Sequence, residues 1–181
     1  MAQRPIRRLN AAGLFEYAVG ALRGRAYSTG DLRQKMTQKA ELAADVDQVI
    51  ARLKGLGYLD DKRFAESFAA ARKENQGFGR TRVIRDLRQR RIAPTVAGRA
   101  VENVYNEADE AGMIDAYIRR KYRNAASDTL FHDPKDLASA YRRLVNAGFD
   151  SGKAIRALKK FAADPDLLDQ FEPPAEESGD A

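Results

Sequence analysis

Apolar residues recur at every third or fourth position along most of the chain, and alternation at every second position is scarce. A repeat near 3.6 residues is typical of amphipathic helices, whereas a repeat of two is typical of strands. Gly, Pro, Asp and Ser interrupt the pattern at intervals that suit short joints between helices. The hydrophobic pattern therefore predicts an all-α protein.

The predicted helices form three groups of three. Repeat 1 covers residues 14–57, with helices over 14–23, 31–39 and 46–56. Repeat 2 covers residues 58–106, with helices after Asp60, over 80–90 and from Pro94. Repeat 3 covers residues 107–163, with helices over 107–123, from Pro134 and after Asp150 or Ser151. Since such modules stack on their neighbours, we expect three tandem three-helix repeats in an elongated, curved array.

The three groups resemble one another at constant offsets. A shift of 57 residues sets Ile92 against Phe149, and with it Leu87 against Leu144. A shift of 51 residues sets Leu32 of repeat 1 against Val83 of repeat 2. Any helical chain aligns with itself at some shift, but the shared breaker between the second and third helices favours a true repeat.

Polar residues and glycines mark the predicted helix ends. Side-chain oxygens that precede an apolar run can accept hydrogen bonds from the free N–H groups of the first turn. Gly57 and Gly148 can take the left-handed conformation that ends a helix. The expected caps are Ser28 or Thr29, Asp45, Asp60, Asp133, and Asp150 or Ser151. In the helix after Asp60 we expect Phe64, Phe68 and Ala71 to form the buried stripe.

The 181 residues contain no cysteine and a single histidine, His132. Disulfides, thiolate zinc sites and cysteine nucleophiles are thereby excluded, and one histidine cannot build a multi-histidine metal site. Gly77-Phe78-Gly79 lacks the Gly-Lys-Ser/Thr of a phosphate loop. We expect no catalytic set, no metal and no cofactor. Without such a set we expect a protein that is not an enzyme. The chain also has no apolar run long enough to cross a membrane, and we expect it to be cytoplasmic.

Charge is distributed unevenly along the chain. Residues 164–181 carry seven acids and no Lys or Arg, and their composition is typical of a disordered acidic tail. Residues 1–163 hold all 32 basic residues against 19 acids, a net charge of +13. The first 13 residues form a basic N-terminal segment. A body this basic favours an anionic partner, either nucleic acid or an acidic protein surface.

Three basic clusters are the candidate partner-binding residues. Guanidinium groups bind phosphates and carboxylates through paired hydrogen bonds, although each single arginine is equally well explained as part of a solvated helix face. Asp86 offers the only neutralisation within the first cluster. The candidates are Arg80, Arg82, Arg85, Arg88 and Arg91, then Arg119, Arg120, Lys121 and Arg123, and finally Lys153, Arg156 and Lys160.

Three segments resemble the RecX family of regulatory proteins. Gly57-Tyr58-Leu59-Asp60-Asp61-Lys62-Arg63-Phe64-Ala65 resembles the family's signature segment, and Gly79-Arg80-Thr81-Arg82-Val83-Ile84-Arg85-Asp86-Leu87 resembles its second block. The stretch from Leu144 to Leu158, with Ala147-Gly148-Phe149, resembles the closing block. The sequence departs from the family at Arg90-Arg91-Ile92, where Lys-Gly often precedes the apolar residue. The missing glycine puts the local turn in question.

The resemblance implies tandem three-helix repeats that lodge in the groove of a RecA nucleoprotein filament and restrain its growth and activity. It therefore predicts a RecA-binding regulator of DNA repair and recombination, which we expect to be a monomer with possible DNA contact through its basic faces. The alternative from the same residues is a stand-alone, sequence-nonspecific DNA-binding protein. An enzyme such as a small nuclease is disfavoured because metal ligands are lacking.

Overall fold

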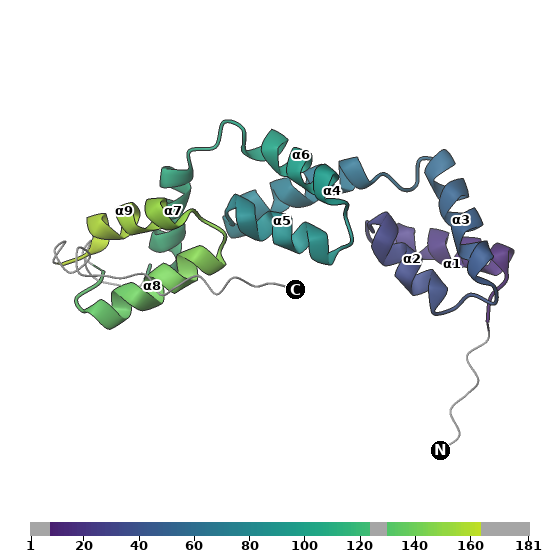
Figure 1. The fold of residues 1–181 in the computed structure, drawn as a ribbon, viewed down its shortest axis with the longest axis horizontal. Coiled ribbons are helices and arrows are strands. Elements are labelled where there is room, and N and C mark those ends of the chain that lie inside the picture. Colours follow the sequence, from purple (N-terminus) through teal and green to yellow (C-terminus); the bar gives the residue numbers. More distant parts are fainter. Residues whose placement is uncertain (1–7, 124–129, 164–181) are drawn as a thin grey trace, which may run out of the picture. The chain divides into compact units, whose positions relative to one another are not determined.

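A computed structural model describes residues 8–123 and 130–163 of the chain. The predicted N-terminal segment lies mostly, and the predicted acidic tail wholly, outside the described residues. The described secondary structure is helical, which confirms the all-α prediction (Figure 1). The helices are α1 (Ala11–Gly24), α2 (Thr29–Thr37), α3 (Ala43–Gly55), α4 (Asp61–Ala71), the π-helical turn η1 (Arg72–Gln76), α5 (Arg80–Gln89), α6 (Pro94–Tyr105), α7 (Glu110–Lys121), α8 (Pro134–Asn146) and α9 (Ser151–Phe161).

The described residues form two compact units. Unit 1 takes them from residues 1–71 and 84–104, and unit 2 takes them from residues 72–83 and 105–181. The division passes through α5, whose first turn belongs to unit 2 and whose remainder belongs to unit 1. The helices follow one another in the predicted order, while the residue boundaries of the three repeats and the shape of the array stay predictions.

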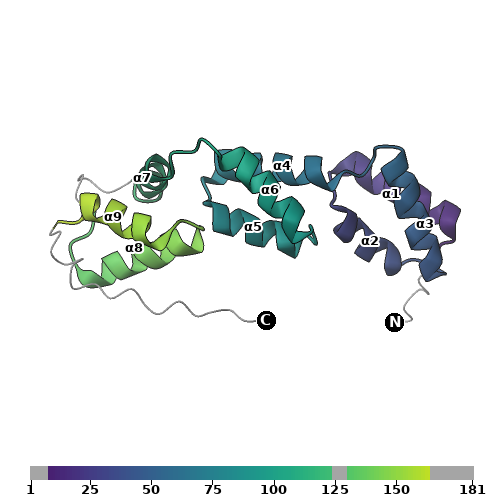
Figure 2. The ribbon, with the colours of Figure 1, turned by 45° about the horizontal axis from the view of Figure 1, so that its top comes forward.

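Unit 1 has its core among α1, α2 and α3, which pack against one another (Figure 2). Leu14, Leu32, Met36 and Leu53 are completely buried there. A short parallel bridge closes the group, because the Leu9 N–H donates to the carbonyl of Lys39 and the Glu41 N–H donates to the carbonyl of Leu9. The apolar stripes expected for these helices therefore face one common core.

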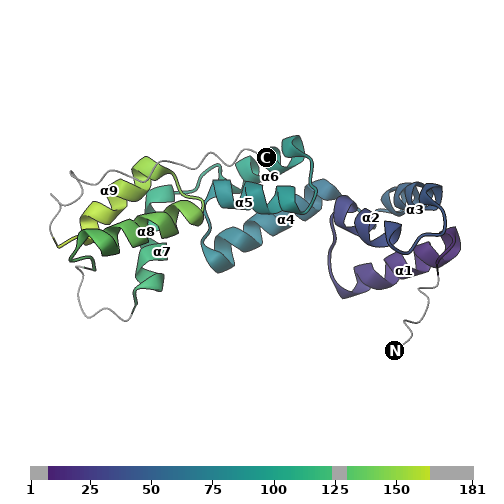
Figure 3. The same ribbon diagram turned by 60° about the horizontal axis from the view of Figure 1, so that its bottom comes forward.

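Unit 2 has its core among α7, α8 and α9, with α8 and α9 lying side by side (Figure 3). Ile114, Leu137 and Leu158 contribute one completely buried side chain from each helix. Two edge-to-face aromatic pairs pack in this core: Tyr117 with Phe149 at 5.6 Å between ring centroids, and Tyr122 with Phe131 at 5.1 Å. Such pairs add about 1 kcal/mol beyond the area that they bury.

Most of the predicted caps are confirmed. Ser28, Asp133 and Asp150 each accept a hydrogen bond from a backbone N–H three residues on, and Asp60 does the same for Arg63. The prediction for Asp45 is wrong, because α3 begins three residues before the predicted start, at Ala43, and its N-cap Leu42 makes no side-chain bond. Asp45 lies instead within the first turn, where its negative charge still favours the helix dipole.

Three helices end in the same turn, with one residue in the left-handed region. Gly57, Arg91 and Gly148 have φ values of 73°, 59° and 90°. In each turn the next N–H donates five residues back: Tyr58 to Leu53, Ile92 to Leu87 and Phe149 to Leu144. This is the Schellman pattern. Arg91 therefore adopts this turn at the position where the resemblance leads one to expect glycine, at a conformational cost of about 1 kcal/mol or more.

Two of these turns, at Arg91 and Gly148, form hydrogen bonds with the start of another helix. In unit 1 the Ser28 hydroxyl, at the start of α2, donates to the carbonyl of Arg90 at 2.5 Å. In unit 2 the Gly79 N–H, at the start of α5, donates to the carbonyl of Ala147 at 2.8 Å. Positions 90 and 147 differ by the 57 residues that the sequence alignment uses. The contact between a helix start and the carbonyl group that precedes a left-handed turn therefore occurs in both units.

Candidate partner-binding surfaces

The arginines of α5 differ in how far they are exposed to solvent. Arg85 and Arg88 are exposed and, being three residues apart, share one side of the helix. Arg80 donates to the carbonyl of Tyr105 at 2.6 Å. Arg82 donates to the carbonyl of Asn146 at 3.3 Å and lies 5.3 Å from the Phe78 ring centroid. Arg85 and Arg88 therefore offer the more accessible guanidinium groups of this cluster.

Arg91 lies in an ion-pair cluster that the local sequence does not reveal. Its guanidinium is 2.8 Å from one carboxylate oxygen of Asp31, and that of Arg90 is 3.7 Å from the other. Asp86, the expected local partner of the cluster, is buried. The acid that pairs with Arg91 comes from α2, sixty residues away in sequence. Arg91 thus contributes to the joint as well as to the surface charge.

The second cluster, at the end of α7, is exposed but partly engaged. Arg120 donates to the carbonyls of Asn75 and Gln76 and lies 5.5 Å from the Tyr117 ring centroid. Lys121 approaches the same ring at 5.7 Å, and Arg119 lies 5.2 Å from that of Phe161. Arg123 is exposed beyond the helix end. Contacts with ring faces hold these cations in position at the surface.

The third cluster joins α9 to α7. Lys153 pairs with Glu110 at 2.5 Å and Lys160 pairs with Asp115 at 3.0 Å. Arg156 lies between these two lysines in sequence and is exposed. The two lysines therefore pair with acids of α7, whereas Arg156 is the cation of this row that is best placed to meet a partner.

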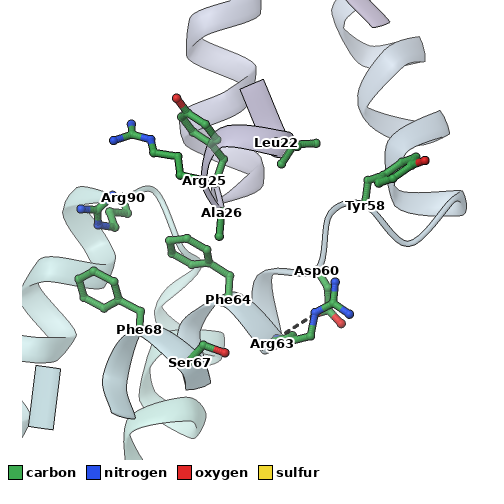
Figure 4. Close-up of a pocket in the computed structure, with 11 residues that line it drawn as sticks. Leu22, Arg25, Ala26, Tyr58, Asp60, Arg63, Phe64, Ser67, Phe68 and Arg90 are labelled. Carbon is green, nitrogen blue, oxygen red and sulfur yellow. Dashed lines mark hydrogen bonds between the residues drawn. The ribbon is translucent and has the colours of Figure 1, made fainter. Parts of the chain in front are cut away.

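A groove in unit 1, here called the aromatic groove, has a volume of about 450 Å³ (Figure 4). Phe64 and Phe68 stack within it, with ring centroids 6.0 Å apart. Both rings are only half-buried, so the predicted stripe of α4 is corrected: Ala65 and Ala69 are the buried residues, and Ala71 is exposed. Its lining is Leu22, Arg25, Ala26, Tyr27, Tyr58, Asp60, Arg63, Phe64, Ser67, Phe68 and Arg90.

Three arginines line the aromatic groove beside its aromatic rings. Arg25 lies 4.4 Å from the Tyr27 ring centroid, and Arg90 lies 4.9 Å from that of Phe68. Arg63 donates to the carbonyl of Gly57 at 3.3 Å. The carboxylate of Asp60 accepts a hydrogen bond from the backbone N–H of Arg63, and this bond lowers the pKa of Asp60. The groove therefore suits a ligand that combines an apolar or aromatic group with negative charge.

Comparison with known proteins shows which family this chain resembles in sequence. The family model described as "RecX, second three-helix domain" matches residues 60–101. Regulatory protein RecX of Trichlorobacter lovleyi is 31% identical over 143 residues, which cover 79% of this chain and 92% of that protein. The chain belongs to the RecX family. Its relative from Thermus thermophilus, also a regulatory protein RecX, is 32% identical over 143 residues, with coverages of 79% and 88%.

Solved RecX structures share the fold. The crystal structure of RecX from Lactobacillus salivarius superimposes with a TM-score of 0.66 at 14% identity and covers 83% of this chain and 96% of that one. A second RecX crystal structure gives a TM-score of 0.62 at 19% identity, covering 82% and 73%. The matched domain at 60–101 contains Phe64, Phe68, Arg85 and Arg88. The family's second domain therefore carries both the α4 side of the aromatic groove and the exposed arginines of α5.

Sequence reasoning missed two further arginines of this RecX chain, Arg142 and Arg143 near the end of α8. Both are exposed, and together with Arg82 they line a cleft in unit 2, here called the arginine cleft. The adjacent pair in an amphipathic helix could have marked them, because two neighbours outside the apolar stripe point to solvent. Their link to Arg82, sixty residues earlier, follows only from the fold.

The described residues hold no group of three or more His, Cys, Asp or Glu side chains that could bind a metal ion. No helix in the described part of this RecX chain is long and apolar enough to span a membrane.

Proposed function

We propose that this RecX protein binds a RecA nucleoprotein filament and lowers its ATPase and recombinase activities. The observation that carries the proposal is the 31% identity to a regulatory protein RecX over most of both chains. The basic helical surfaces support it, because a nucleoprotein filament offers both phosphates and protein carboxylates. In this role the protein acts in the cytoplasm, by binding and without catalysis of its own.

Within this proposal, Arg85 and Arg88 form the principal contact of unit 1. Both are exposed on one side of α5, inside the segment that matches the family's second domain. The opposite side of that helix is anchored by Val83 and Leu87, which are completely buried. A rigid helix presents its two guanidinium groups at a defined spacing, which favours paired hydrogen bonds to carboxylates or phosphates.

The test is the ATPase rate of RecA on single-stranded DNA, measured with the wild-type protein and two variants. Arg85→Glu/Arg88→Glu reverses the proposed contact. Arg23→Glu/Lys54→Glu, at two exposed positions on α1 and α3 of the same unit, makes the same change in charge. We expect the wild type and the control to inhibit, and the first variant to lose inhibition while keeping the wild-type circular dichroism spectrum.

An unchanged ATPase rate at an excess of wild-type protein would reject RecA inhibition. Inhibition that both variants retain would reject Arg85 and Arg88 as the contact. If the wild type binds bare DNA as tightly as it binds the filament, with a steep dependence on salt, the DNA-binding alternative replaces the filament proposal.

A further inference from the structure

The aromatic groove lies within unit 1 and is lined by rings from α4 and from the segment before it. Phe64 and Phe68 project from α4, and their ring centroids are 6.0 Å apart (Figure 4). Tyr58, which precedes α4, is 52% exposed. The groove volume of about 450 Å³ lies in the range of about 300–1,000 Å³ that ligand pockets occupy. The rings therefore give the groove an apolar face on which a large side chain of a ligand can pack.

The positive charge of the aromatic groove comes from three arginines that differ in exposure. Arg25 and Arg63 are exposed, whereas Arg90 is half-buried. The guanidinium of Arg90 lies 3.7 Å from a carboxylate oxygen of Asp31, which compensates part of its charge. Arg25 and Arg63 therefore provide most of the positive charge that a ligand in the groove would meet. Their guanidinium groups are suited to carboxylates as well as to phosphates.

A carboxylate in the same lining distinguishes between these two kinds of anion. The side chain of Asp60 accepts a hydrogen bond from the backbone N–H of Arg63 at 3.0 Å. An ionised carboxylate has room for several donors. A peptide brings backbone N–H donors together with its acidic side chains, whereas the phosphate groups of a nucleic acid bring acceptors only. The presence of Asp60 beside the arginines therefore favours a peptide over a nucleic acid strand.

The residue types of the lining also match those of protein interfaces. Aromatic residues and Arg are enriched where proteins bind each other, while Lys and Glu are depleted. The described lining includes two Phe, two Tyr and three Arg, and it includes neither Lys nor Glu. A segment that carries both apolar and acidic side chains is complementary to this combination of rings and guanidinium groups.

We propose that the aromatic groove binds a short acidic peptide segment of a protein partner. In this arrangement a large apolar side chain of the segment packs on Phe64 and Phe68, and flanking carboxylates pair with Arg25 and Arg63. The assignment deepens the proposed function and rests on it for the identity of the partner, because it gives unit 1 a contact with the protein component of the filament.

A purely structural explanation of the same arginines makes a different prediction. Arg25 and Arg90 lie over aromatic rings of their own chain, and such contacts stabilise a folded protein. If this were the only role of the rings and cations, changes in the groove would lower the melting temperature and leave peptide binding unchanged. The experiment therefore measures the melting temperature and the peptide affinity of each variant.

The probe is a fluorescein-labelled hexapeptide, Asp-Glu-Phe-Asp-Glu-Leu, whose binding to the full chain is followed by fluorescence anisotropy at low salt. Two further peptides separate the contributions of charge and apolar side chains. Asp-Glu-Ser-Asp-Glu-Ser keeps the charge and lacks the apolar groups, and Lys-Lys-Phe-Lys-Lys-Leu keeps the apolar groups and reverses the charge. We expect both to bind the wild type weaker than the probe by about tenfold or more, because each lacks one half of the complementarity.

Tyr58→Ala and Leu56→Ala form a matched pair that tests the rings. The two side chains are 52% and 55% exposed, so neither truncation opens a cavity in the core. Tyr58 lines the groove, whereas Leu56 does not. We expect Tyr58→Ala to weaken binding of the probe by about fivefold or more and Leu56→Ala to bind like the wild type, since aromatic anchors dominate the energy of small interfaces.

Arg25→Glu/Arg63→Glu tests the charges, and Lys54→Glu/Arg99→Glu is its control. All four side chains are exposed and lie in unit 1, but only the first two line the groove. Both variants change the net charge of the protein equally. We expect the groove variant to lose affinity for the probe by on the order of tenfold or more, with the control much closer to the wild type.

Four results would overturn the proposal. The first is equal binding of the probe by the wild type and both groove variants, and the second is equal binding of the probe and the serine peptide. The third is displacement of the probe by oligothymidine at the concentrations at which unlabelled probe displaces it, which would assign the groove to nucleic acid. The fourth is tighter binding by Leu167→Ser/Phe171→Ser, which would assign the groove to the acidic tail of the chain itself.

The peptide assay and the ATPase assay fail independently. The peptide assay contains no RecA, so an unchanged affinity in the groove variants would reject the groove and leave RecA inhibition standing. Conversely, an ATPase rate that the wild type does not alter would reject RecA as the partner and leave the peptide site of unit 1 intact.

Discussion

Replacement of Gly79 by alanine should disrupt the joint between α5 and the corner that follows α8. A methyl group at this position would overlap the carbonyl group of Gly148, which is backbone and cannot rotate away. The Gly79 N–H also donates to the carbonyl of Ala147 at 2.8 Å, so any shift that relieves the overlap weakens that bond. Both effects act on the same few atoms of unit 2.

The magnitude follows from these two effects. Forcing an extra methyl group into a packed site costs about 1–3 kcal/mol. Loss of the hydrogen bond adds about 1 kcal/mol. We therefore expect Gly79→Ala to lower the free energy of unfolding by about 2–4 kcal/mol.

Gly98→Ala is the matched control, because no atom lies within 4 Å of the added methyl group in α6. In a helix interior alanine is more stable than glycine by about 0.5–1 kcal/mol, so this variant should be slightly stabilised. Urea unfolding followed by circular dichroism at 222 nm measures both variants. A Gly79→Ala variant whose unfolding free energy lies within about 0.5 kcal/mol of the wild type would refute the steric argument.

Two other predictions concern single side chains. Ser28→Ala should lower the free energy of unfolding by about 2–3 kcal/mol in chemical denaturation, because it removes the α2 cap and the donor to the Arg90 carbonyl. Asp133→Ala removes only a cap and should lower it by about 1 kcal/mol. Equal losses in the two variants would contradict the double role of Ser28. Burial raises the pKa of Tyr105 from 10.0 to about 12. Because the pKa of Tyr105 is higher in the folded than in the unfolded protein, the stability due to its proton is complete below pH 10.0 and is lost as pH rises through about 12. Tyr105→Phe should therefore flatten the pH dependence of the unfolding free energy in this range. An unaltered pH dependence would count against this role of Tyr105.

Helices, caps and turns could be predicted from the sequence because they depend on neighbours along the chain. Ser28, Asp133 and Asp150 cap the helices where the pattern places them, since each bond spans only three residues. Asp45 shows the limit of such reasoning: α3 could also begin at Ala43 without a side-chain cap. Family membership was likewise accessible, because its signature segments are short and local.

Side-chain roles that depend on distant partners could not be predicted. The period of α4 identifies its apolar residues but does not say whether alanines or phenylalanines face the core. Close packing on Ala65 and Ala69 leaves Phe64 and Phe68 half-exposed in the aromatic groove. Similarly, the list of basic residues does not show that Lys153 and Lys160 pair with acids of α7.

The sequence by itself determined that this chain is helical, repetitive and basic, because hydrophobic period, capping residues and charge are properties of neighbouring positions. Only the tertiary structure decided which basic side chains contact other parts of the protein and which are exposed to a partner. Ser28 meets Arg90 across 62 residues, and Arg82 meets Asn146 across 64. Such contacts form only when helices that are distant in sequence pack together, since hydrogen bonding and burial depend there on atoms that local sequence cannot bring together.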